Sequence, residues 1–140
     1  GGDACVFLLK RFIILCTRIA REKFSVSPER EKAFDMVRQF YVLVDNHFKE
    51  KKMVQDYANM LHRSPKTLSN LFTTCGLPSP LRIIHERIEA EAKRLLLYSQ
   101  KSAKEITEIL GFEDQATFSR FFKKMTGESV SEYRKREKQE

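Results

Sequence analysis

The stretch that decides the fold lies at residues 111–127 and reads Gly111-Phe112-Glu113-Asp114-Gln115-Ala116-Thr117-Phe118-Ser119-Arg120-Phe121-Phe122-Lys123-Lys124-Met125-Thr126-Gly127. The pattern predicts a tight turn followed by a helix, because the aromatic residues at 118, 121 and 122 recur at three- and four-residue steps and so share one helical face. The other face carries polar and cationic side chains, with no acidic residue between positions 115 and 126. A helix of this kind is suited to the major groove of DNA.

A segment of the same design lies upstream. Its helix carries Tyr57-Ala58 and Leu61, and its second helix carries Leu68-Ser69-Asn70-Leu71-Phe72. The offset to the downstream segment is 49 residues from Ala58 to Thr107 and 50 from Leu68 to Phe118, because the second turn is one residue longer. Each segment is a short helix, a tight turn and a second helix with a polar outer face, which is the helix-turn-helix pattern.

Helix signals recur along the rest of the chain, and no hairpin turn or period-two run favours a strand. Serine-proline pairs at 27–28 and 64–65 combine a cap with a proline at the first helical position. Serine and glutamate at 102 and 105, and again at 129 and 132, have the spacing of a capping box. We therefore expect an all-α fold with helix-turn-helix units at about 53–74 and 103–125, joined by a long connecting helix at about 81–98.

The connecting helix also predicts how the units would be used. About 17 residues at 1.5 Å each give roughly 25 Å. With the reach of the units themselves, this could hold two recognition helices about one DNA turn (~34 Å) apart.

Composition narrows the function classes. The chain has 140 residues and a formal net charge of +7, which favours an anionic partner. Its three cysteines are widely spaced, and no histidine stands at metal-ligand spacing to them, so we expect reduced thiols, a cytoplasmic protein and no metal site. No glycine-rich phosphate loop or nucleophile-base arrangement occurs. We expect no catalytic residues, no cofactor and no enzymatic activity.

The run Gly-Phe-x-Asp-x-x-x-Phe-Ser-Arg-x-Phe-Lys-Lys-x-x-Gly at 111–127, followed by Tyr133-Arg134, resembles the signature of AraC/XylS-type transcriptional regulators. The runs at 64–72 and 86–96 are similar to the first unit and the connecting helix of the same family. The resemblance covers about residues 32–136. It implies a seven-helix DNA-binding domain with two helix-turn-helix units, found in bacterial-type regulators that mostly activate transcription by contacting RNA polymerase.

Three residues depart from the family pattern. Val130 stands where proline is usual, Thr107 where alanine is usual, and Asn70 where arginine is common. A capping box can still start the helix at Val130. The asparagine predicts that the first unit reads its half-site differently, by favouring adenine or by making a weaker contact.

The resemblance also implies a domain organisation. We expect the AraC-type DNA-binding domain at 31–140, and we expect residues 1–30 to be the linker or terminal helix of an N-terminal sensory or dimerisation domain outside this chain. Residues 5–24 form a basic amphipathic stretch, which would either pair with its copy in a homodimer or pack on the DNA-binding domain. Such a helix can also lie on membranes, but its charges do not separate cleanly and its apolar runs are too short to cross a bilayer, so no membrane partner is expected.

The candidate DNA contacts divide by chemistry. Arg120 is the leading base reader because a guanidinium fork matches guanine O6 and N7. Asp114 is the expected N-cap of its helix. The base-reading candidates are Lys66, Thr67, Ser69, Asn70, Gln115, Ala116, Thr117, Ser119 and Arg120, and the phosphate-binding candidates are Arg63, Lys123 and Lys124. For Lys66, a base contact and a phosphate contact remain equally open.

Two functions remain in view. The first is a sequence-specific transcription regulator, an activator, that inserts two recognition helices into successive major grooves of double-stranded DNA, with RNA polymerase as a further partner. The alternative is a helical protein-interaction module whose basic face binds an acidic protein. A measurement of DNA binding at low salt distinguishes the two functions, because near-zero affinity would favour the protein-interaction module.

Overall fold

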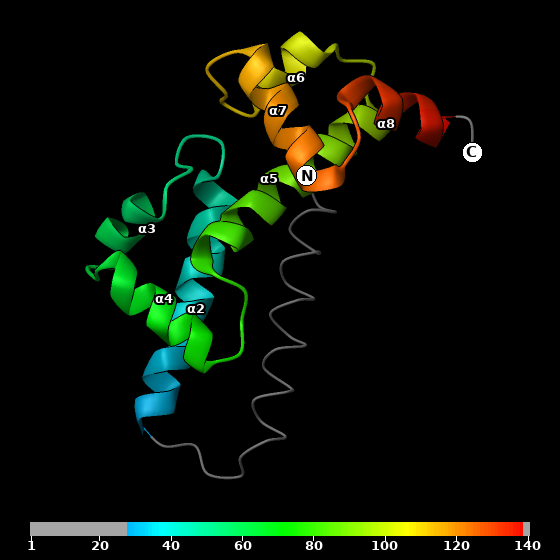
Figure 1. The fold of residues 1–140 in the computed structure, drawn as a ribbon. Helices are drawn as coiled ribbons and strands as arrows, with labels where there is room; N and C mark the ends of the chain where they lie inside the picture. Colours follow the sequence, from blue (N-terminus) through cyan, green and yellow to red (C-terminus); the bar gives the residue numbers. More distant parts are fainter. Residues whose placement is uncertain (1–27, 139–140) are drawn as a thin grey trace. The chain divides into compact units, whose positions relative to one another are not determined.

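The computed structural model describes residues 28–138, where all the regular secondary structure is helical (Figure 1). The helices of this part are α2 (Pro28–His47), α3 (Val54–Met60), α4 (Pro65–Thr74), α5 (Pro80–Tyr98), α6 (Ala103–Ile109), α7 (Gln115–Thr126) and α8 (Val130–Lys138). The predicted all-α fold is confirmed. The extra amphipathic helix expected near the N-terminus, and with it the interactions expected of residues 5–24, lies outside the described residues.

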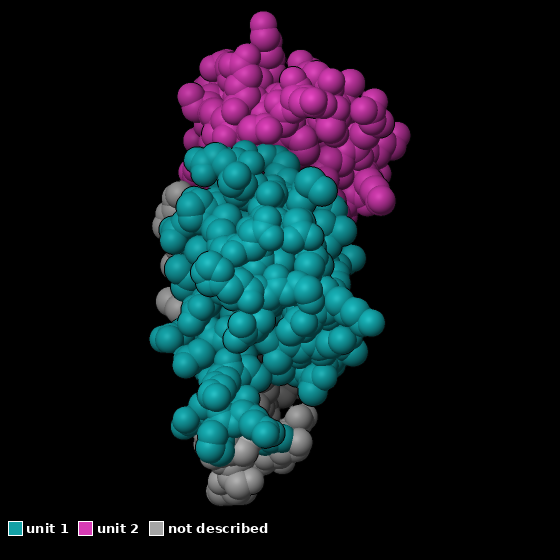
Figure 2. Space-filling model, turned by 90° about the vertical axis from the view of Figure 1, so that its left-hand side faces the viewer, with its two compact units in different colours: residues 1–87 teal, residues 88–140 magenta. Residues whose placement is uncertain are grey.

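The chain divides into two compact units, residues 1–87 and residues 88–140, coloured teal and magenta in Figure 2. Unit 1 contains α2, α3, α4 and the first part of α5, and unit 2 contains the rest of α5 with α6, α7 and α8. Each unit therefore holds one of the two predicted helix-turn-helix pairs, α3–α4 or α6–α7, with its own buried side chains.

An aromatic cluster forms the core of unit 1. The Phe40 ring of α2 lies 5.5 Å from the Tyr57 ring of α3 and 5.0 Å from the Phe72 ring of α4, measured between centroids. All three side chains are fully buried, and the Tyr57 hydroxyl donates to the carbonyl of Lys51 at 2.6 Å. Since this ring is removed from water, burial raises the pKa of Tyr57 well above its usual range. The helices α2, α3 and α4 thus each contribute one aromatic ring to the core of unit 1.

The core of unit 2 is built on the predicted aromatic stripe. Phe118 and Phe122 are fully buried, and the Phe122 ring meets the Tyr133 ring of α8 edge-on at 5.4 Å. Phe112 in the turn lies 5.4 Å from both Phe118 and Phe121. Phe112, Phe121 and, in unit 1, Leu71 are only partly buried, so the buried part of the aromatic stripe of α7 is Phe118 and Phe122.

Several helix boundaries have clear chemical causes. Ser102 and Glu105 form the predicted capping box, with each side chain bonded to the other residue's backbone amide. α8 begins at the buried Val130, and the Ser129 hydroxyl accepts from the amide of Glu132 at 3.1 Å. Pro80 is the first residue of α5. A proline is tolerated there because the first helical amide has no partner within the helix.

Arg134, the last residue of the signature run, closes the end of α5. Its guanidinium donates to the carbonyls of Leu96 at 3.1 Å and Ser99 at 3.4 Å. The last four carbonyls of a helix have no intrahelical partners, and a cation at this end also complements the helix dipole. The neighbouring Tyr133 packs inward while Arg134 binds backbone, so this pair supports the fold of unit 2.

Candidate nucleic-acid interface

Both helix-turn-helix pairs bend at the same kind of helix end. In α3 the amide of Arg63 donates to the carbonyl of Ala58 at 2.9 Å, and that of His62 to Asn59 at 3.2 Å. In α6 the amide of Phe112 donates to the carbonyl of Thr107 at 3.1 Å, and that of Gly111 to Glu108 at 3.1 Å. These paired bonds define a Schellman motif, whose central residue takes a left-handed conformation. His62 and Gly111 accordingly have φ values of +55° and +78°.

The second helices of the two pairs begin with the same cap. The Ser64 hydroxyl accepts from the amide of Thr67 at 3.1 Å, and a carboxylate oxygen of Asp114 accepts from the amide of Thr117 at 2.7 Å. A side chain at this position satisfies one of the free amides of the first turn. The predicted N-cap role of Asp114 is confirmed. Together, the matched ends and caps give α4 and α7 equivalent starts within their own units.

The predicted readers of α7 lie on its outer face. Gln115, Ala116 and Arg120 are exposed, as are Lys123 and Lys124 at the end of the helix, whereas Thr117 and Ser119 are partly buried. Phe118 and Phe122 occupy the opposite face and are fully buried. The helix thus has one face fixed to the core of unit 2 and another that presents hydrogen-bonding and cationic groups.

The predicted contacts of unit 1 are also accessible. Lys66, Thr67, Ser69 and Asn70 are exposed on α4, opposite the buried Leu68 and Phe72. Arg63 is exposed in the turn, where its guanidinium donates to the carbonyl of His62 at 3.1 Å.

The two outer faces differ strongly in charge. With the 50-residue offset, Asn70 of α4 corresponds to Arg120 of α7, and Thr73 and Thr74 correspond to Lys123 and Lys124. The hydroxyls of the two threonines donate at 2.9 Å to the carbonyls of Ser69 and Asn70, so both turn back onto their own helix. The last turn of α4 has no basic residue, whereas that of α7 has two. The outer face of α7 therefore carries more positive charge at its end than that of α4.

One arrangement was missed at the level of sequence. The Thr117 hydroxyl donates to Asp114 Oδ1 at 2.8 Å and accepts from the Arg120 guanidinium at 3.4 Å, which links the cap to the leading base-reading candidate. Hydrogen bonds from the amide and hydroxyl of Thr117 lower the pKa of Asp114, and the charge of Arg120 adds to this. The signal for the arrangement was the spacing Asp-x-x-Thr-x-x-Arg, in which steps of three residues share one helical side.

Ala58 and Thr107 occupy equivalent positions on α3 and α6, and both are buried. A hydroxyl at such a place needs a partner, and that of Thr107 donates to the carbonyl of Ala103 at 2.7 Å. The departure from alanine noted in the sequence is therefore accommodated within α6 itself.

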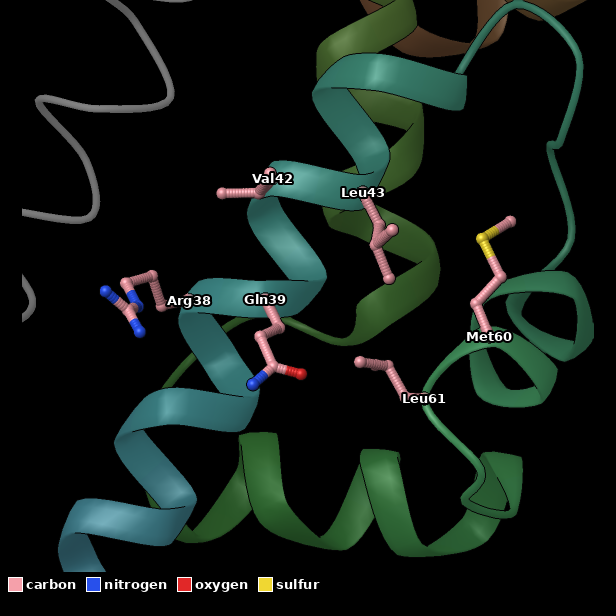
Figure 3. Close-up of a pocket in the computed structure, with 6 residues that line it drawn as sticks. All are labelled: Arg38, Gln39, Val42, Leu43, Met60 and Leu61. Atoms are coloured by element: carbon pink, nitrogen blue, oxygen red, sulfur yellow. The ribbon is translucent and has the colours of Figure 1, made fainter.

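A separate hollow lies on unit 1, between α2 and the end of α3 (Figure 3). It has a volume of about 410 Å³ and is lined by Arg38, Gln39, Val42, Leu43, Met60 and Leu61. Leu43 and Leu61 point toward its interior (Figure 3). None of the predicted DNA-contacting residues lines this hollow. Within residues 28–138, no cluster of side chains is suited to hold a metal ion, and no helix there is long and apolar enough to cross a membrane.

Comparison with known proteins gives this arrangement a context. A family described as a helix-turn-helix domain matches residues 57–136. The chain is 30% identical over 122 residues to YisR of Bacillus subtilis, named as an HTH-type transcriptional regulator, and this match covers 86% of the chain and 41% of YisR. The chain therefore spans less than half the length of this relative.

Solved structures agree in fold. The C-terminal domain of AraT, a response regulator from Geobacillus stearothermophilus, superposes with a TM-score of 0.64 at 29% identity, over 71% of this chain and 84% of that domain. The DNA-binding domain of AdpA, solved in complex with a target DNA, superposes with a TM-score of 0.60 at 23% identity, over 69% of this chain and 87% of that one.

Proposed function

Because the chain belongs to the AraC-type family of helix-turn-helix transcriptional regulators, we propose that it binds double-stranded DNA in a sequence-specific way, with α4 and α7 as two recognition helices in successive major grooves. Arg120 is the principal base reader, and Lys123 and Lys124 bind phosphates. Since α5 passes from one unit into the other, both pairs act on one duplex.

One observation carries the proposal. In both units the first helix ends in a Schellman motif and the second helix begins at an N-cap side chain. One face of each second helix is buried, and the predicted readers lie on the other side of it. A helix that enters a major groove needs such an outward face with side chains that reach base edges. The alternative of a helical module that binds an acidic protein is not favoured by the family.

The experiment is a selection of binding sites from a random duplex pool by the full chain, followed by affinity measurements across a salt series. We expect a bipartite site with half-sites about one helical turn apart. Arg120→Ala should then cost about 1–3 kcal/mol on that site and relax the preference at one position. Enrichment of a single half-site would restrict reading to one helix. No enrichment and no salt-dependent binding would overturn the proposal.

We extend the proposal to regulation: the bound chain activates transcription by contacting RNA polymerase beside the promoter. The support is the family resemblance alone. The test places the selected site upstream of a weak promoter, and the expected result is increased transcription in the presence of the chain. Unchanged or decreased transcription from a promoter that the chain demonstrably occupies would contradict activation and leave DNA binding intact.

A further inference from the structure

We propose that Asp114 and Thr117 are positioning residues for Arg120, and that the Thr117 hydroxyl passes the fixed orientation of the helix cap to the guanidinium that reads a base. This inference rests on the proposed function and deepens it, since it moves Thr117 from the set of base readers to the set that determines how sharply Arg120 discriminates.

The Thr117 hydroxyl can form only a limited set of hydrogen bonds. A hydroxyl has one proton to donate and two lone pairs that accept. Its proton goes to Asp114 Oδ1 at 2.8 Å, and one lone pair accepts from Arg120 Nη2 at 3.4 Å. With its only proton committed to the carboxylate, Thr117 has none to offer a base. One of its two lone pairs is occupied by the guanidinium.

The carboxylate of Asp114 is itself held in place by the first turn of α7. Asp114 Oδ1 also accepts from the amide of Thr117 at 2.7 Å, so the cap is tied to the backbone of the first turn. Hydrogen bonds to an ionised group are the shorter and stronger ones. The same carboxylate oxygen therefore holds both the backbone amide and the hydroxyl of Thr117.

The guanidinium of Arg120 keeps donors for a base. A guanidinium has five N–H donors in a fixed plane, and the contact with Thr117 uses one of them. The other donors can still form the two parallel bonds that guanine accepts at O6 and N7. Arginine has a long side chain whose rotamer freedom is costly to lose on binding. A side chain already held near its bound position loses less of it.

Unit 1 supplies the contrast. There the cap is a serine, and its hydroxyl lies 2.8 Å from the Thr67 hydroxyl without any carboxylate. Asn70 stands in the place of Arg120, and within residues 28–138 its side chain has no hydrogen-bond partner. The same cap geometry is thus present in both helices, but only α7 extends it to the reading side chain. This makes Thr67 the natural matched control for Thr117.

The test compares affinity for two duplexes, the selected site and the same site changed at the base pair where Arg120→Ala relaxes the preference. Thr117→Val keeps the branched shape and the capped amide but removes the hydroxyl. We expect the affinity ratio between the two duplexes to fall about five-fold, as for the loss of one hydrogen bond. Thr117→Ser should restore the ratio. Thr67→Val should act on the other half-site and leave this ratio at its original value.

A double-mutant cycle separates positioning from a general effect on the helix. In the Arg120→Ala background, Thr117→Val should change the ratio no further. Thermal unfolding followed by helical circular dichroism checks that each variant is folded. An unchanged ratio in Thr117→Val, an equal loss on both duplexes, or a change that persists without Arg120 would each overturn the positioning role while sequence-specific binding stands. If the unaltered chain shows no sequence preference, the proposed function fails and this inference fails with it.

Discussion

The guanidinium of Arg87 lies over the ring of Phe48, 4.1 Å from its centroid, and its Nε donates to Asp45 Oδ1 at 2.9 Å. Arg87 is only 2% exposed. A buried cation is stable only where its charge is paired and its donors are satisfied. Here Asp45 of α2 pairs with the charge, and Phe48, the residue that follows α2, covers the guanidinium.

We therefore expect Arg87→Ala to destabilise unit 1 by about 3 kcal/mol, because it removes a buried ion-pair partner and the aromatic contact. The matched control is Arg38→Ala, which breaks an exposed pair with Asp35 at 3.2 Å and should change the free energy of unfolding by no more than about 0.5 kcal/mol. Chemical denaturation of both variants measures the difference. Equal effects would show that burial of Arg87 contributes nothing to stability.

His62→Gly is expected to stabilise the chain. His62 has a φ of +55°, where a Cβ is crowded and glycine is favoured, while the equivalent Gly111 is already a glycine. The gain should be about 0.5–1 kcal/mol in unfolding free energy. The reverse change, Gly111→Ala, should cost a similar amount. A loss of stability in His62→Gly would mean that the imidazole makes a compensating contribution.

Asn70→Arg should convert the first recognition helix toward the chemistry of the second. The new guanidinium would stand three residues after Thr67, as Arg120 does after Thr117, and would favour guanine at its base position. Repeating the site selection with this variant checks the shift. Since serine replaces aspartate at the cap, the new preference should be weaker than that of Arg120. A selected site identical to that of the unaltered chain would exclude Asn70 from the reading face.

Lys123→Ala should weaken binding to all duplexes alike and lower the slope of log affinity against log salt by about one phosphate contact. The complementary change is Thr73→Lys, which places a cation at the corresponding position of α4 and should raise the slope by a similar amount. Filter-binding titrations from low to moderate salt measure both. Loss of affinity for one sequence alone would instead make Lys123 a base reader.

Acid should weaken α7 through Asp114. Its pKa is lowered from the ordinary 3.8, first by the hydrogen bond from the Thr117 amide. A depressed carboxyl pKa stabilises the fold above the unfolded value, so the contribution is present at neutral pH and is lost as the pH falls below 3.8 through the folded pKa. Asp114→Asn keeps a capping side chain, and should unfold with a flatter acid profile than the unaltered chain. Parallel profiles would contradict the link.

Much of this architecture could be predicted from the sequence because the signals were local. Three helix starts are predicted by signals within four residues: Ser64-Pro65, the Ser102–Glu105 capping box and Asp114. The aromatic stripe of α7 predicts which of its faces is buried. These elements formed where the spacing placed them. Local chemistry of this kind is little altered by the rest of the fold.

The unpredicted features depend on contacts between distant residues or on backbone conformation. The pairing of Arg87 with Asp45 joins positions 42 residues apart, and the cap that Arg134 places on α5 joins positions 38 apart. In the sequence, Arg87 and Arg134 cannot be distinguished from arginines on a solvent-exposed helix face. The left-handed turn at His62 was hidden because glycine, its usual marker, is absent there. The hydrogen bonds of Thr117 to Asp114 and Arg120 were not predicted, because a sequence cannot show where a hydroxyl proton is donated.

The extra residue of the second turn has a definite place. Arg63 is the last residue of the Schellman motif in the first pair, and Ser64 caps the next helix at once, whereas Glu113 stands between Phe112 and Asp114 in the second. Both helix boundaries are closed by their own hydrogen bonds, so a residue added at this junction alters the register of neither helix. Turn length is therefore a parameter that protein engineering can vary: inserting a residue before Ser64, or deleting Glu113, should leave the hydrogen bonds that close both helices of the pair in place.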